Sequence, residues 1–166
     1  MPPGKVIAVC LSPRKGVRKR EVRTALLVEG HGMEGDAHAG PWHRQVSLLS
    51  RESVDTMRAK GLNVSPGSFG ENVTTEGVSL TSLRPGQRLR IGMEALLEIT
   101  QIGKECHDRC AIYRQVGDCV MPREGVFARV LRGGEIRAGD AVVDEVEERK
   151  GCQDRPSGPS ISRSFR

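Results

Sequence analysis

The residues of this chain with the clearest capacity for chemistry are thiols that gather in one short stretch: Cys106, Cys110 and Cys119. The stretch follows a predicted strand at residues 95–100 and also carries ionisable neighbours: Lys104, His107 and Arg109. Nearby cations favour the thiolate over the thiol, and a thiolate can attack sulfur, carry a persulfide or bind a soft metal. We therefore expect a reactive thiol at the end of this strand, with Lys104 and Arg109 stabilising its negative charge.

A zinc site is the main alternative for these thiols. Its candidate ligands supply sulfur and nitrogen: Cys106, His107, Cys110 and Cys119. Their spacing differs from the paired C-x-x-C segments of typical zinc-binding domains, so zinc is the minor alternative. The chain has five cysteines, and an odd number argues against a disulfide framework. Cys10 lies inside an apolar strand and is expected to be a buried small hydrophobe.

Two further clusters combine glycine with polar residues at short spacing, one at residues 30–45 and one at residues 66–74. Closely spaced glycines allow positive φ and close backbone approach, so backbone amides can line a pocket for an anion or a cofactor. Each cluster alone is typical of turns. The two clusters together with the thiols indicate a functional pocket.

Composition restricts the class of protein. Hydrophobic residues make up 37% of the 166-residue chain and aromatics only 3%, which predicts one domain with a core of Val, Leu and Ile. We place this domain at residues 1–148, followed by a basic tail at 149–166 that is expected to be disordered. The sequence shows no long apolar run and no signal-peptide pattern, which predicts a cytoplasmic protein without a membrane partner. Much of the net charge of +5 comes from the tail, and no aromatics interleave with the basic cluster at 14–20, so nucleic acid is not an expected partner.

Short β-rich segments recur along the chain between Gly and Pro residues. They are predicted at residues 6–11, 23–28, 45–49, 88–91, 95–100 and 140–144. Helices are predicted at residues 50–60, where Ser50 can cap the N-terminus, and at residues 124–131, with a further helical turn at 110–116. The sum is a mainly β fold, a closed or partly closed barrel with two or three short helices.

At these clusters the chain resembles the MOSC domains, a family named after the C-terminal domain of molybdenum cofactor sulfurases. The matching segments occur in order between residues 5 and 146: residues 35–40, 44–49, 67–73, 85–86, the cysteine after the 95–100 strand, and 139–140. One such match would be weak, but six in order are specific. The resemblance implies a barrel-like MOSC fold of the small stand-alone bacterial type. It also implies a cysteine in a pocket for the molybdenum cofactor or its sulfur.

The resemblance extends to individual residues. Cys106 and Cys110 are both candidates for the functional thiol and for a ligand to molybdenum. Alignment through the preceding strand favours Cys106, whereas Arg109 and Cys110 together resemble a motif of the reductase branch of the family. The cations expected to hold the phosphate of the molybdopterin cofactor are Lys15, Lys19 and Arg44. The residues expected to line the pocket and hydrogen-bond the pterin are Asp36, His38, Gln45 and Asn72.

The leading functional hypothesis is that the protein binds the molybdenum cofactor, carries sulfane sulfur as a cysteine persulfide for metallo-sulfur cofactor maturation, or does both. Its expected partners are a sulfur donor such as a cysteine desulfurase, and molybdopterin biosynthesis enzymes or molybdoenzymes as acceptors. One alternative is a molybdenum cofactor-dependent reductase of N-hydroxylated compounds, which would take its electrons from a partner. The other is a zinc-stabilised, non-catalytic binding module.

Overall fold

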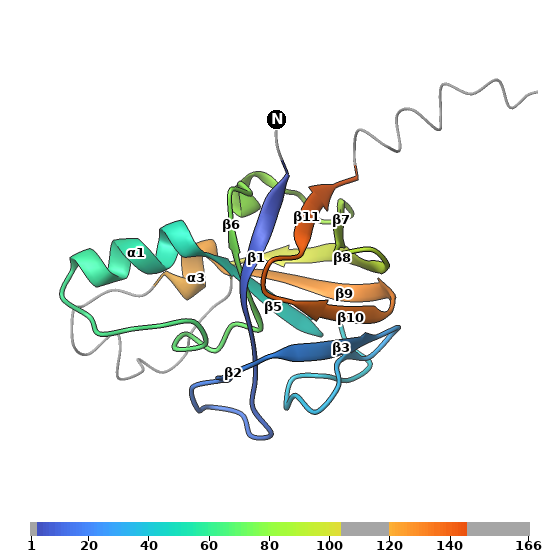
Figure 1. The fold of residues 1–166 in the computed structure, drawn as a ribbon, viewed down its shortest axis with the longest axis horizontal. Helices are drawn as coiled ribbons and strands as arrows, with labels where there is room; N and C mark the ends of the chain where they lie inside the picture. Colours follow the sequence, from blue (N-terminus) through green and yellow to red (C-terminus); the bar gives the residue numbers. More distant parts are fainter. Residues whose placement is uncertain (1–2, 104–119, 146–166) are drawn as a thin grey trace, which may run out of the picture.

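The computed structural model describes residues 3–103 and 120–145, and the protein is mainly β over these ranges (Figure 1). The strands are β1 (Gly4–Leu11), β2 (Arg20–Val22), β3 (Thr24–Val28), β4 (Gly32–Met33), β5 (Val46–Ser50), β6 (Val73–Glu76), β7 (Arg88–Ile91), β8 (Ala95–Ile102), β9 (Val126–Arg132), β10 (Gly134–Arg137) and β11 (Ala141–Asp144). The helical segments are α1 (Arg51–Ala59), the 3-10 turn η1 (Leu80–Ser82) and α3 (Met121–Glu124).

Seven strands close into a barrel, which confirms the predicted fold class. The sheet runs in the order β11-β7-β8-β9-β5-β6-β1-β2, and β11 also pairs with β1 to complete the circle. All of these pairs are antiparallel except β5 with β6. Closure leaves no free edge within the barrel, which removes a liability of short strands. A second sheet, in the order β10-β3-β4, lies beside it (Figure 1).

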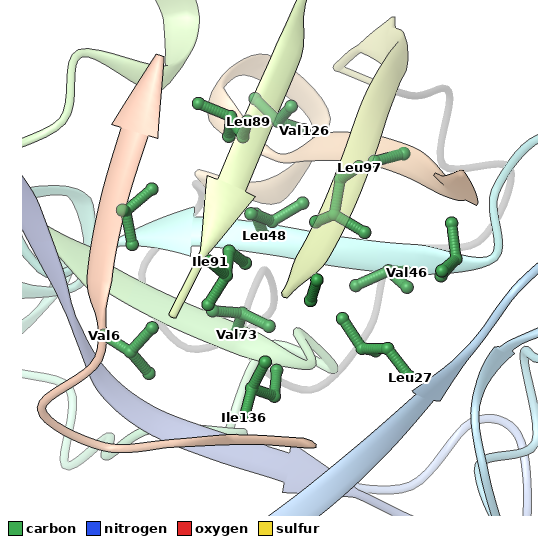
Figure 2. Packing of buried hydrophobic residues seen from close by; sticks show 14 of the residues in the cluster. Val6, Leu27, Val46, Leu48, Val73, Leu89, Ile91, Leu97, Val126 and Ile136 are labelled. Carbon is green, nitrogen blue, oxygen red and sulfur yellow. The ribbon is translucent and has the colours of Figure 1, made fainter. Parts of the chain in front are cut away.

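The core is aliphatic, as the composition predicts. Side chains alternate along the strands: in β7, Leu89 and Ile91 are buried, and the two arginines that alternate with them, Arg88 and Arg90, lie farther out. Figure 2 shows these two residues meeting inward-facing side chains of other strands, such as Leu48 and Leu97. The same cluster includes Leu27 and Ile136 from the second sheet, so that sheet packs against the barrel core.

Helix α1 confirms the helix predicted at residues 50–60. Ser50 is its N-cap, with the side-chain oxygen accepting from the Ser53 amide, and the chain turns away at Gly61, where φ is +97°. Val54 and Met57 bury one face of α1 in a small cluster shared with Met121 of α3. The two helices lie together on one side of the barrel (Figure 1). α1 also supplies the crossover that the parallel β5–β6 pair requires.

The prediction of a helix at residues 124–131 is wrong, because the chain from Val126 onward forms β9. The single turn α3 ends at Gly125, whose φ of −70° and ψ of 143° are extended. From Val126 to Val130 the strand is buried on both faces apart from Arg129, which forms a cross-strand ion pair with Glu98. A short apolar run that is buried on both faces cannot be distinguished from a helix by its periodicity alone.

Within the described ranges, none of the helices is long and apolar enough to cross a membrane. The helical turn predicted at residues 110–116 lies outside those ranges, as does the tail from residue 146 onward.

Candidate functional site

A buried ion pair forms the centre of the candidate site. The Lys19 ammonium lies 2.7 Å from Oδ1 of Asp36, and the two side chains are only 1% and 0% exposed. Lys19 directly precedes β2, and Asp36 follows β4. The Ser12 backbone amide, at the end of β1, donates to the same carboxylate oxygen over 3.0 Å. The Asp36 carboxylate therefore ties together loops from two hairpins.

His38 contacts both members of this pair. Its Nδ1 lies 3.0 Å from Lys19 Nζ, and its backbone amide donates to Oδ2 of Asp36 over 3.1 Å. The imidazole is 36% exposed, whereas its two partners are buried. The Trp42 indole N–H donates to the His38 carbonyl over 2.7 Å, which fixes the turn that carries the histidine. Together the three polar residues form what we call the Lys19–Asp36–His38 triad.

The surroundings of Asp36 determine its charge. Burial alone would raise its pKa, but the contacts with His38, Lys19 and the Ser12 amide outweigh burial and hold the pKa below the ordinary value of 3.8. The carboxyl is therefore ionised at neutral pH and keeps a cation beside it.

A second cluster, which is cationic and aromatic, includes two residues that follow His38 closely, Trp42 and Arg44. Lys15 and Phe127 complete it, and we call these four residues the Arg44 platform. The Arg44 guanidinium carbon is 4.8 Å from the Trp42 ring centroid and 5.5 Å from that of Phe127. Lys15 Nζ lies 5.8 Å from the same Trp42 ring. Cations stack favourably on aromatic faces at such distances. Nε of Arg44 is buried and has no hydrogen-bond partner among the described residues, so a donor remains unsatisfied there.

Hydrogen bonds connect this platform to the end of β8. His43 Nε2 lies 2.8 Å from Oε1 of Gln101, and the Thr100 hydroxyl donates to the His43 carbonyl over 2.6 Å. Gln101 in turn donates to the carbonyl of Gly103 over 2.8 Å. The thiol-bearing segment begins at the next residue, Lys104. Two predicted features, the histidine cluster and the strand before the cysteines, are thus joined directly.

The second glycine cluster stabilises the loops behind the triad. Glu71 is fully buried and accepts from the amides of Gly67 and Phe69 and from the Thr74 hydroxyl. Burial raises the pKa of Glu71 above its ordinary value, although these donors oppose the shift. Gly67 then accepts from the Lys19 backbone amide over 2.9 Å. The conformation of this loop therefore determines where Lys19 lies.

Asn72 and Gln45 are buried, and their side chains bond to the protein itself. Asn72 Oδ1 accepts from the amide and hydroxyl of Ser47, and its Nδ2 donates to the Cys10 carbonyl over 3.1 Å. Gln45 Oε1 accepts from the Val130 amide over 2.9 Å. Both residues therefore connect the loop clusters to barrel strands.

The structure brings some of the predicted site residues together. Lys19, Asp36 and His38 form the triad, and Lys15 and Arg44 form the cationic part of the platform. The remaining predicted residues at the thiol segment lie outside the described ranges: Lys104, Cys106, Arg109 and Cys110. The zinc ligand set falls in the same segment, and residues 3–103 and 120–145 contain no other cluster of metal-ligating side chains.

Cys10 is a buried hydrophobe, as predicted. It is 0% exposed, and burial, followed by the nearby Glu71 carboxylate, raises the pKa of its thiol to about 12. A thiol in that environment stays protonated and unreactive.

The sequence reasoning missed Trp42 and Phe127 as the aromatic partners of Arg44. Trp42 is the only tryptophan of the chain, and it lies inside a glycine-rich polar segment where no core residue is expected. That position was a signal for a binding surface. Phe127 carries no such signal, because its segment is predicted to be a helix.

Replacing Gly67 by Ala tests how far the loop controls Lys19. Gly67 has φ of +89°, and an added Cβ would overlap the Lys19 carbonyl oxygen and lie 3.1 Å from the Cys10 sulfur. Gly35 has nearly the same φ, +87°, with nothing within 4 Å, so Gly35→Ala isolates the backbone strain. We expect Gly35→Ala to lower the free energy of unfolding by about 1–2 kcal/mol. Gly67→Ala should cost about 1–3 kcal/mol more because of the overlap. Equal urea midpoints for the two variants would contradict the close packing of Gly67 on Lys19.

Comparisons with known proteins agree with this architecture. The MOSC domain family model matches residues 34–143. The structure of YuaD from Bacillus subtilis superposes with a TM-score of 0.70 at 20% identity, covering 84% of this chain and 93% of that one. YiiM from Geobacillus stearothermophilus gives a TM-score of 0.64 at 21% identity, covering 86% and 75% of the two chains. No curated protein matches the chain. The structural likeness shows the fold, and the family match spans most of the chain, so this protein belongs to the MOSC domain family.

Proposed function

We propose that this MOSC domain binds the molybdenum cofactor at the Arg44 platform and carries sulfane sulfur as a persulfide on Cys106 or Cys110. MOSC domains are associated with molybdenum cofactor binding in general. The observation that best supports the proposal for this chain is the unsatisfied Nε of Arg44, whose guanidinium lies over the rings of Trp42 and Phe127, with Lys15 over the same Trp42 ring. The platform is bonded to the strand that leads into the thiol segment.

The platform fits the chemistry of the cofactor. A guanidinium binds phosphate through two parallel hydrogen bonds, and Lys15 adds a second positive charge. Trp42 supplies an aromatic ring, and aromatic rings stack on planar heterocycles such as a pterin. Lys19 was expected to hold the phosphate as well, but its ammonium already contacts Asp36 and His38. We assign phosphate binding to Lys15 and Arg44, and assign support of the loops to Lys19, Asp36, Gln45 and Asn72. When bound, the cofactor supplies the redox and soft-ligand chemistry of its metal.

The sulfur step follows from the thiol. The thiolate of Cys106 or Cys110, stabilised by Lys104 and Arg109, would attack the outer sulfur of a donor persulfide. One sulfur–sulfur bond forms as another breaks, and the donor leaves as a thiolate, so the transfer needs no external oxidant or reductant. A cysteine desulfurase is a donor of this chemical kind, and a molybdoenzyme or molybdopterin-processing enzyme is the corresponding acceptor.

Separate Cys106→Ser and Cys110→Ser variants test the sulfur step. After incubation with a persulfide donor, intact-mass measurement should show one added sulfur atom on the wild-type protein and none on the variant that lacks the functional thiol. Cys10→Ser is the matched control, because that buried thiol should accept no sulfur. Full retention of the added sulfur by both single variants and the double variant would exclude a persulfide on these residues.

Replacing Arg44 by Gln tests the cofactor site. Since Trp42 is the sole tryptophan, quenching of its fluorescence reports binding at the platform. We expect Arg44→Gln to weaken binding of the isolated cofactor by about 10- to 100-fold, the loss of a charge-assisted hydrogen bond worth about 1.5–3 kcal/mol. Arg23→Gln, at an exposed arginine between β2 and β3, should leave the affinity unchanged. Equal affinities for both variants would show that the phosphate binds elsewhere.

A further inference from the structure

The contact between Lys19 and His38 determines which imidazole nitrogen carries the proton. Lys19 Nζ lies 3.0 Å from Nδ1 of His38. An ammonium group has three donors and no acceptor, so Nδ1 must accept this hydrogen bond. In a neutral imidazole the nitrogen that accepts is bare and the other carries the proton. Neutral His38 therefore has its proton on Nε2.

Asp36 keeps the ammonium in place for this contact. It binds Lys19 at 2.7 Å, and its other oxygen accepts from the His38 backbone amide. The same oxygen lies 3.7 Å from Nδ1, which is too long for a hydrogen bond. The carboxylate therefore fixes the histidine backbone and the lysine charge, and does not compete for the imidazole proton.

We infer that Lys19 is a positioning residue that holds His38 as a neutral Nε2–H hydrogen-bond donor for an oxyanion ligand. The hydrogen bonds of His38 to described side chains involve Nδ1 and not Nε2, and the imidazole is partly exposed while Lys19 and Asp36 are buried. Nε2 already carries a proton, and the lone pair of Nδ1 accepts from Lys19, so His38 in this form is not the base that ionises the functional thiol. The ligand part of this inference rests on the proposed function, whereas the proton position does not.

The proton position is measured by 15N NMR of histidine-labelled, ligand-free protein at neutral pH, because bare and protonated ring nitrogens have well-separated shifts. His38→Gln identifies the His38 signals among those of the four histidines. We expect a bare Nδ1 and a protonated Nε2. A variant with both Lys19→Met and Asp36→Asn removes both buried charges and should shift His38 to a mixture of tautomers. A proton on Nδ1 of wild-type His38, or on both nitrogens, would overturn the inference whether or not the variant folds.

Titration with inorganic phosphate then tests the donor role, with Trp42 fluorescence recorded in parallel. We expect the Nε2 signal of His38 to move as the fluorescence changes. Gln can present an N–H close to the position of Nε2, so His38→Gln should retain part of the phosphate affinity, whereas His38→Ala should lose more. A change in Trp42 fluorescence without movement of Nε2 would overturn the donor role alone. If neither responds, the anion site of the proposed function fails, and the ligand-free spectrum still decides the role of Lys19.

Discussion

Replacing Lys19 by Met is expected to lower the free energy of unfolding by about 3–5 kcal/mol, because the buried Asp36 carboxylate would lose its counter-charge. The side chain of Asp36 is 0% exposed, so water cannot take the place of the ammonium. Urea unfolding followed by circular dichroism measures the effect. The fluorescence of Trp42, which is bonded to the His38 carbonyl, reports the same transition from within the site.

Two controls separate this effect from the general cost of losing a lysine. The Lys19→Met, Asp36→Asn double variant leaves no unpaired charge and should recover most of the lost stability. Arg51→Met removes an ion pair of similar length, 2.6 Å to Glu76, but both side chains are substantially exposed. Arg51→Met should lower the free energy of unfolding by less than about 1 kcal/mol. Similar losses for Lys19→Met and Arg51→Met would contradict the buried pair.

The same pair makes stability depend on pH in a defined direction. The folded state holds the pKa of Asp36 below its ordinary value of 3.8, so the carboxyl binds its proton less readily than in the unfolded chain. The stabilisation is complete above pH 3.8 and is lost as the pH falls below it. Wild-type protein should lose more stability than the double variant over this acidic range.

The Asn72→Asp substitution should lower the free energy of unfolding by about as much as Lys19→Met, on the order of 3–5 kcal/mol. It places a charge in a fully buried site whose partners fit an amide. Nδ2 of Asn72 donates to the Cys10 carbonyl, and a carboxylate oxygen there would face another acceptor. Burial raises the pKa of the introduced carboxyl. The loss in the free energy of unfolding should therefore become smaller as the pH falls and the carboxyl becomes neutral.

Asn63→Asp is the matched control for this change. Asn63 is exposed in the segment after α1, so the same chemical change should alter the free energy of unfolding by less than about 0.5 kcal/mol. Equal thermal melting temperatures for the two variants at neutral pH would contradict the assignment of Asn72 as a buried link between β1 and β5.

The strands could be predicted where turn residues and β-branched residues punctuate the sequence. The predicted segments at 6–11 and 88–91 correspond closely to β1 and β7. β9 could not be recognised, because the barrel core buries Val126, Ala128 and Val130 on one face while the cluster with α1 and α3 buries Phe127 on the other. Both contacts are made with distant parts of the chain, and the segment itself carries no trace of them. β2 and β4 are too short to produce a pattern, and they form through pairing with longer neighbours.

The candidate site could be predicted by residue type but not by role. The sequence indicates Asp36 and His38 as candidate pocket residues because they lie among closely spaced glycines. Lys19 was only one of several cations in a basic cluster, and nothing local distinguishes it from Lys15. Its burial follows from the β1–β2 hairpin, which brings it to a carboxylate 17 positions away along the chain. Asn72 and Gln45 are predicted as pocket-lining residues by type alone, and the sequence gives no sign that Asn72 Nδ2 donates to the Cys10 carbonyl or that Gln45 Oε1 accepts from the Val130 amide.

The pairing of β1 with β11 has a consequence for biosynthesis. Gly4 lies opposite Val142 and Lys5 opposite Ala141, so during synthesis β1 must wait for β11, more than 130 residues later, before the circle is complete. Ordering so long an intervening segment before this contact forms is entropically costly and slow. Nascent chains that end before residue 141 should therefore expose an unpaired strand edge and depend on chaperones. Pulse proteolysis of ribosome-bound chains of increasing length should show resistance only after β11 has emerged.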